Sequence, residues 1–71
     1  MMIVSARMMS GTIFTFELDN VFFIYKVKKL KYLLSRELRQ LPSNIIIYKD
    51  QEQIDDSDIL KGEEYTIFVN N

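Results

Sequence analysis

The sequence contains no cysteine and no histidine, and it has only two glycines and one proline. The lack of cysteine excludes disulfide bonds and thiolate chemistry, and it is compatible with a reducing compartment. The lack of histidine removes the most common general base and a frequent metal ligand. Two glycines do not form the glycine-rich loop that cradles phosphates. We therefore expect no enzyme activity, no cofactor and no metal site.

Long apolar runs are also absent. The longest one, Val21 to Tyr25, is far shorter than the ~20 residues of a membrane-spanning helix. The first residues lack the basic segment and the long apolar run of a signal peptide. We expect an intracellular protein, cytoplasmic or nuclear, with no membrane association. The abundance of isoleucine, lysine and asparagine indicates an AT-rich genome, such as that of a large DNA virus or a protist. For a viral protein the location would be the host cell.

The residues that are present suit one small packed domain. The chain has 71 residues, of which 48% are hydrophobic and 13% aromatic. This composition favours a folded core over a disordered tail. No repeat, linker or low-complexity segment divides the sequence, so we expect a single domain over residues 1–71. Its length lies near the lower limit at which a core forms without disulfides or metals.

The N-terminal segment predicts a β-hairpin. Apolar and polar residues alternate over Met2–Met8 and over Thr12–Leu18, and Gly11 lies in the intervening turn, where a residue with positive φ is needed. Successive side chains of a strand point to opposite faces of the sheet. The residues expected to point inward are Met2, Val4, Ala6, Phe14, Phe16 and Leu18.

After the hairpin the periodicity changes. Apolar residues recur at spacings of three and four from Val27 to Leu41, with basic residues between them, and Pro42 follows. This pattern predicts an amphipathic helix from about Ile24 to Gln40. The preceding run, residues 21–23, fits a helix and a strand equally well.

The last third of the sequence predicts two more strands, Ile45–Lys49 and Tyr65–Val69, because both are rich in β-branched and aromatic residues. Between them, residues 50–53 predict a polar turn, and Ile54 is a candidate start of a very short strand. Residues 55–58 fit either a tight turn or the cap of a single helical turn. The expected order is strand, strand, helix, strand, short element, strand.

This order of elements, together with several local motifs, resembles the ubiquitin family. The segment Met2–Leu18 resembles the first hairpin of ubiquitin without a gap. The resemblance implies an α+β fold, the ubiquitin-like β-grasp, in which a mixed sheet of four to five strands packs on one amphipathic helix. The later motifs that carry the resemblance are the helix pattern Val27, Leu30, Lys31 and Leu34, the step Leu41-Pro42, the strand Ile46-Ile47-Tyr48 and the terminal segment Gly62–Val69.

The C-terminal residues differ from those of ubiquitin. Ubiquitin and its conjugated relatives continue into a mobile tail that ends in Gly-Gly, whereas this sequence ends in Val69-Asn70-Asn71. We therefore expect a ubiquitin-like protein that is not conjugated and that acts by non-covalent binding. Two alternatives stay open: a modifier whose tail was removed, and a domain of a longer protein truncated before its tail.

The resemblance also implies a binding site on the exposed face of the sheet. In the later strands we expect Ile46, Tyr48, Tyr65, Ile67 and Val69 to point inward, and Ile45, Ile47, Thr66 and Phe68 to point outward with Ile3. The positions that match the ubiquitin recognition patch predict a protein-binding patch of Met9, Ile45, Ile47, Thr66 and Phe68, with Arg7 at its rim. The partners implied are ubiquitin-receptor-like proteins or other ubiquitin-pathway components, and self-association through the same patch stays open.

The charge distribution provides an alternative function. Six of the nine basic residues lie between Lys26 and Arg39, and seven of the ten acids lie between Asp50 and Glu64. This distribution predicts a basic patch and an acidic patch. The basic helix Lys26–Arg39 makes nucleic acid or another polyanion an alternative ligand. The net charge of −1 disfavours this alternative. The acids of residues 55–58 lack the spacing of a calcium loop and are interpreted as turn residues.

Overall fold

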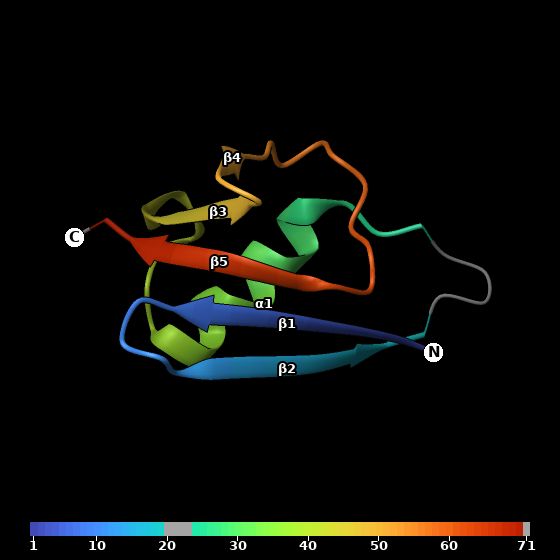
Figure 1. Cartoon of the computed structure of the whole chain (residues 1–71), viewed down its shortest axis with the longest axis horizontal. Helices are drawn as coiled ribbons and strands as arrows, with labels where there is room; N and C mark the ends of the chain where they lie inside the picture. Colours follow the sequence, from blue (N-terminus) through green and yellow to red (C-terminus); the bar gives the residue numbers. More distant parts are fainter. Residues whose placement is uncertain (20–23, 71) are drawn as a thin grey trace.

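A computed structural model describes residues 1–19 and 24–70 (Figure 1). The unassigned run at residues 21–23 lies outside the described residues. The described elements, in chain order, are β1 (Met2–Met8), β2 (Ile13–Leu18), α1 (Val27–Leu38), the 3-10 turn η1 (Pro42–Asn44), β3 (Ile45–Lys49), β4 (Glu52–Gln53) and β5 (Glu64–Val69).

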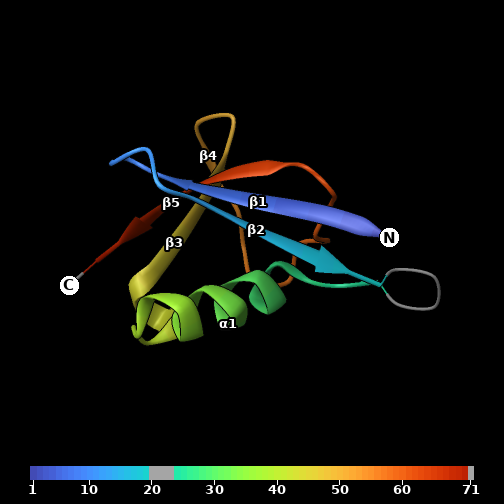
Figure 2. The same cartoon turned by 90° about the horizontal axis from the view of Figure 1, so that it is seen from below.

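The strands form a five-stranded sheet in the order β2-β1-β5-β3-β4. β1 and β5 pair in parallel, while the other neighbours pair in antiparallel fashion, so the sheet is mixed. Helix α1 crosses one face of this sheet (Figure 2). We call the face toward α1 the inner face and the opposite one the outer face. The predicted architecture, a mixed sheet packed on one helix, is confirmed.

The hairpin prediction is also confirmed. In β1 and β2, Val4 pairs with Phe16 and Ala6 with Phe14, which places these side chains on one face. Val4 and Ala6 are fully buried, and the two phenylalanines pack against the edge of the core. Gly11 has a φ of 95°, and its N–H donates to the carbonyl of Met8 at 2.9 Å. The turn therefore uses the glycine at the position where a Cβ atom would cause strain.

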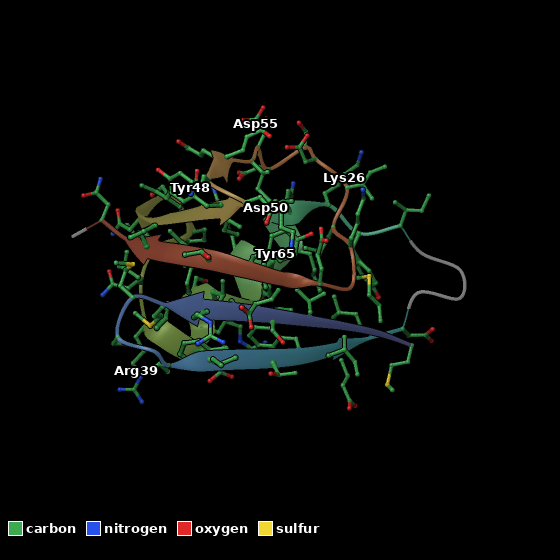
Figure 3. All side chains as sticks on the ribbon, viewed as in Figure 1. Lys26, Arg39, Tyr48, Asp50, Asp55 and Tyr65 are labelled. Atoms are coloured by element: carbon green, nitrogen blue, oxygen red, sulfur yellow. The ribbon has the colours of Figure 1, made fainter. Side chains whose placement is uncertain are left out.

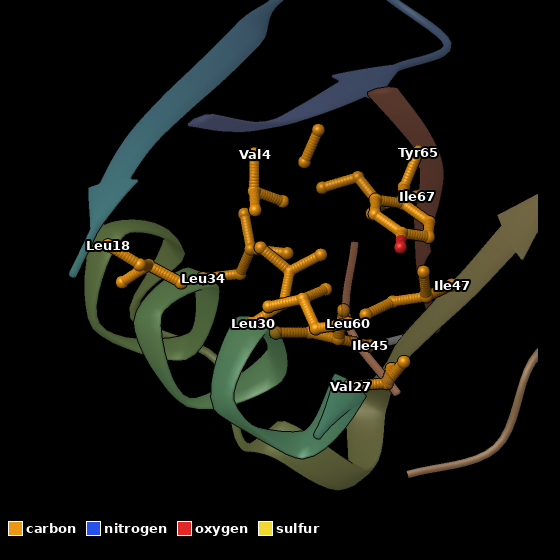
Figure 4. Packing of buried hydrophobic residues seen from close by; sticks show 11 residues of the cluster. Val4, Leu18, Val27, Leu30, Leu34, Ile45, Ile47, Leu60, Tyr65 and Ile67 are labelled. Atoms are coloured by element: carbon orange, nitrogen blue, oxygen red, sulfur yellow. The ribbon is translucent and has the colours of Figure 1, made fainter. Parts of the chain in front are cut away.

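Helix α1 is shorter at both ends than the sequence pattern predicted. Val27, Leu30 and Leu34 are fully buried beneath the sheet (Figure 4). The helix ends at Leu38, and the residue that follows, Arg39, has a left-handed φ of 55° and donates its N–H to the carbonyl of Ser35. An αL residue stops a helix while it satisfies one of the last carbonyl groups, and this accounts for the C-terminal boundary.

The start of α1 depends on a distant segment. No side chain caps this terminus, but the N–H of Val27 donates to the carbonyl of Asp58 at 2.8 Å and that of Lys28 to the carbonyl of Asp56 at 3.1 Å. The carboxylate of Asp56 also lies 2.6 Å from the Lys31 ammonium. The acidic turn thus supplies acceptors and negative charge at the positive end of the helix. The predicted acidic and basic segments therefore meet in the fold.

The polar segment after β3 contains a turn and a short strand. Asp50 and Gln51 both have positive φ, 51° and 72°. Such a pair of residues joins β3 to β4 in the manner of a tight hairpin turn, in which Asp50 is labelled in Figure 3. Ile54 follows β4 and donates its N–H to the carbonyl of Ile47 at 3.0 Å. Residues 55–58 form a tight turn, as one of the two interpretations predicted, closed by an N–H to carbonyl bond of 3.0 Å.

The predicted orientation of β3 is wrong by one residue. Ile45 and Ile47 are 1% and 0% exposed, and Ile47 pairs with the buried Ile67 of β5. Ile46 and Tyr48, which were expected inside, therefore lie on the outer face. Three consecutive isoleucines carry no alternation, and a shift of one residue exchanges the two faces of a strand. The pairing with β5 decides the orientation because cross-strand partners share a face.

Among the described residues, the core contains one polar side-chain group, the hydroxyl of Tyr65. This oxygen accepts the N–H of Lys61 at 3.0 Å, and burial raises the pKa of Tyr65 above its ordinary value. The ring packs in the buried cluster of aliphatic side chains (Figure 4), and the Lys49 ammonium lies 5.8 Å from its centre. The buried residues are Val4, Ala6, Leu18, Val27, Leu30, Leu34, Ile45, Ile47, Leu60, Tyr65 and Ile67.

Two substitutions in β3 test its orientation. We expect Ile47→Ala to lower the free energy of unfolding by about 2 to 5 kcal/mol, because it opens a cavity in the core. Ile46→Ala should cost less than about 1 kcal/mol, because Ile46 lies on the outer face. Urea denaturation followed by circular dichroism measures both values. A larger loss for Ile46→Ala than for Ile47→Ala would contradict the orientation described above.

Tyr65 should make stability depend on pH in the alkaline range. Its raised pKa keeps the folded phenol protonated at pH values where the unfolded phenol ionises. The folded state then binds more protons, so the free energy of unfolding should fall as pH rises above about 10. Tyr65→Phe should cost about 1 kcal/mol at neutral pH and give a shallower decline. Urea midpoints of both proteins between neutral and strongly alkaline pH provide the measurement, and parallel curves would disprove this role.

Candidate functional site

Apolar side chains gather at one end of the outer face. Ile46 pairs with Phe68, and Tyr48 pairs with Thr66, so β3 and β5 place these four residues together. The rings of Tyr48 and Phe68 meet edge to face, with centroids 5.3 Å apart and planes at 84°. The β1–β2 turn adds Met9 beside them. We call this surface the outer patch; it consists of Met9, Ile46, Tyr48, Thr66 and Phe68.

The outer patch is accessible and uneven. Met9 is 76% exposed and Phe68 is 38% exposed. Two shallow hollows lie beside Phe68, with volumes of about 310 and 320 Å³. The first lies toward the β1–β2 turn, and the second lies between Phe68, Tyr48 and the β3–β4 turn. An aromatic ridge with a hollow on either side is a shape into which apolar side chains of a partner can fit.

Charged groups border the outer patch on β1 and β5. Arg7, which lies opposite Thr66, donates two hydrogen bonds to the Glu64 carboxylate at 3.1 and 3.4 Å. Exposed pairs of this kind contribute little to stability, roughly 1 kcal/mol or less. Arg7 and Glu64 form a polar rim on this side of the outer patch, with about half of each side chain exposed.

The rest of the outer face is more polar. Ser5 and Thr15 lie opposite each other, with their hydroxyl oxygens 3.4 Å apart. Ile3 is 49% exposed and pairs with Glu17, at the opposite end of β1 from the outer patch. Ile13, 46% exposed, lies opposite Arg7 on the same face. Ile3 and Ile13 are thus single apolar residues beside polar partners, whereas Ile46, Tyr48 and Phe68 adjoin one another.

Part of the predicted site is found on this face. Met9, Thr66 and Phe68 lie together, with Arg7 at their rim, whereas Ile45 and Ile47 belong to the core and cannot contact a partner. The predicted inclusion of these two isoleucines is corrected accordingly.

Ile46 and Tyr48 are the patch residues that the sequence reasoning missed. A usable signal was the hydroxyl of Tyr48, which would have needed a hydrogen-bond partner at an inward position. On the outer face that hydroxyl meets solvent instead. With Tyr48 pointing outward, alternation places Ile46 on the same face.

None of the helical segments within residues 1–19 and 24–70 has the length and hydrophobicity needed to span a bilayer. Over the same residues, no three carboxylates are grouped closely enough to hold a metal ion.

The arrangement of a mixed five-stranded sheet around a single helix is the ubiquitin-like β-grasp fold. Among solved structures, the chain is similar to a computationally designed protein based on the template of human erythrocytic ubiquitin, determined by NMR in solution. The TM-score is 0.75 at 21% sequence identity, and the match covers 100% of this chain and 94% of that chain. No family model matches the sequence, and comparison with curated proteins finds no similar sequence. The likeness shows the fold.

Proposed function

We propose that the chain is a ubiquitin-like interaction module that binds other proteins non-covalently through the outer patch. The observation that carries this proposal is the position of Phe68 on a sheet face, accessible and flanked by two hollows. A sheet face that meets only water is ordinarily polar. Contiguous apolar side chains on such a face favour an interface.

The mechanism is insertion of apolar partner side chains beside an aromatic anchor. A buried aromatic anchor typically contributes about 2 kcal/mol or more to binding. Phe68 is already held by its contact with Tyr48, so little side-chain entropy is lost when a partner covers it. Met9 is unbranched and exposed, which lets it adapt to the partner surface. Arg7 and Thr66 lie where they can exclude water at the rim.

The fold and this surface together support a class of partner. Ubiquitin-receptor-like proteins and other ubiquitin-pathway components are the proposed partners, and a second copy of the chain is the alternative occupant of the same patch. The proposed role involves no catalysis, in keeping with a sequence that lacks histidine and cysteine.

Polyanion binding through α1 has weaker support. Lys31 is paired with Asp56 at 2.6 Å, so one of the basic residues of the helix is already neutralised. The acidic turn also lies against the start of α1, where it would repel a phosphate backbone.

The experiment is a titration of the isotope-labelled protein with purified ubiquitin-receptor domains, followed by NMR chemical shifts, with sedimentation measurements of the protein alone. We expect shifts or self-association that involve Met9, Ile46 and Phe68. Phe68→Ser should weaken the interaction at least tenfold, about 1.4 kcal/mol. It should also leave the thermal unfolding transition cooperative, because Phe68 lies on the outer face.

Ile3→Ser is the matched control, because it removes an exposed apolar side chain from the same face at its opposite end. This variant should bind like the original protein. Equal losses for Ile3→Ser and Phe68→Ser would contradict the proposed location. If the original protein neither binds the receptor domains nor self-associates, the proposed function itself is contradicted.

A further inference from the structure

The side of α1 that faces away from the sheet carries an exposed tyrosine between two cations. Tyr32 is 52% exposed. The Lys29 ammonium lies 5.8 Å from the centre of its ring, and the Arg36 guanidinium lies 6.0 Å from it. Spacings of three and four residues place these side chains along one stripe of the helix. The ring is therefore held in place without being covered.

A hollow of about 380 Å³ lies beside Tyr32 at the start of the helix. Ile24, 77% exposed, and Tyr25 provide further apolar surface there. The hydroxyl of Tyr25 donates to the carbonyl of Asp19 at 2.8 Å, which fixes the orientation of this ring. We call the surface the helix-face site; it is lined by Ile24, Tyr25, Lys26, Lys28, Lys29 and Tyr32.

The charged side chains that line the helix-face site are all cationic. The ion pairs formed within residues 1–19 and 24–70 include Lys31 of this helix but not Lys28, Lys29 or Arg36. The helix carries a single acid, Glu37. The site thus combines an apolar floor with cations that have no carboxylate partner among the described residues.

We propose that the helix-face site binds an acidic segment of a partner protein that carries one apolar or aromatic anchor. The anchor would occupy the hollow against Tyr32, and its flanking carboxylates would face Lys28 and Lys29. Charge complementarity is the argument for this ligand. Helix α1, which carries this site, lies on one side of the sheet (Figure 2), and the outer patch belongs to the opposite face of the sheet, so the inference does not rest on the proposed function.

A short acidic peptide segment fits this surface better than a nucleic acid does. A phosphate chain requires a row of cations along its path. Here Lys31 is paired, and Asp56 and Asp58 border the start of the same helix. One apolar hollow with a few adjacent cations instead matches a short acidic motif with a single anchor.

The experiment uses a short synthetic peptide of aspartates and glutamates with one central phenylalanine, titrated into the isotope-labelled protein. We expect NMR shifts that concentrate between Ile24 and Arg36. A peptide with serine in place of the phenylalanine should bind about tenfold more weakly. Tyr32→Ser, which is neutral for helix propensity, should also lose about tenfold in affinity.

Lys28→Glu and Lys61→Glu form a matched pair of charge reversals, since both lysines are exposed and only the first borders the site. We expect about tenfold weaker peptide binding for Lys28→Glu. Lys61→Glu should change it little. If both variants lose the same affinity, binding depends only on the net charge of the protein, and the proposal is overturned. It is also overturned if the serine peptide binds equally well, if neither peptide binds, or if oligothymidylate displaces the phenylalanine peptide at physiological salt.

Discussion

The position of β5 in the middle of the sheet is the constraint on which the rest of the structure depends. This strand pairs in parallel with β1 and in antiparallel fashion with β3. Its inner residues Tyr65 and Ile67 meet the helix, while Thr66 and Phe68 form part of the outer patch. A shift of one residue would exchange these pairs, removing the patch and exposing the core together. The sheet register therefore specifies the core and the candidate site at once, although each side chain contributes to only one of them.

A second constraint links the helix to the acidic turn. The free N–H groups at the start of α1 are satisfied by carbonyls of Asp56 and Asp58, from a segment far along the chain. The carboxylate of Asp56 faces Lys31, so the acids gather at the positive end of the helix. This arrangement uses the acids locally and leaves the cations near Tyr32 on a different side of α1. The acidic residues thus stabilise the start of α1, and the basic residues near Tyr32 form an exposed basic surface on another side of the helix.

The elements that could be predicted from the sequence are those with a strong local residue pattern. The hairpin could be predicted because alternation and Gly11 agree, and β5 because Tyr65 and Ile67 alternate with Thr66. The orientation of β3 could not be predicted, because any of its three consecutive isoleucines could point to either face. Only the pairing with β5 decides which of them point inward. The start of α1 was also missed, because its capping groups are distant backbone carbonyls that leave no local pattern. The candidate site inherited the error in β3 and kept the residues contributed by β5 and the first turn.

The size of the domain gives the exposed apolar residues their significance. A chain this short lies near the limit at which a core alone stabilises a fold. Each apolar side chain that stays exposed therefore fails to contribute the free energy that its burial would supply. The outer face nonetheless keeps Ile46 and Phe68 where polar residues would be compatible with the sheet, and α1 keeps Tyr32 on its solvent side. Both surfaces lie outside the buried cluster, one on the outer face of the sheet and the other on the solvent side of α1. Contacts at either surface can therefore change without repacking the core, which is the physical condition for one small fold to hold two independent binding faces.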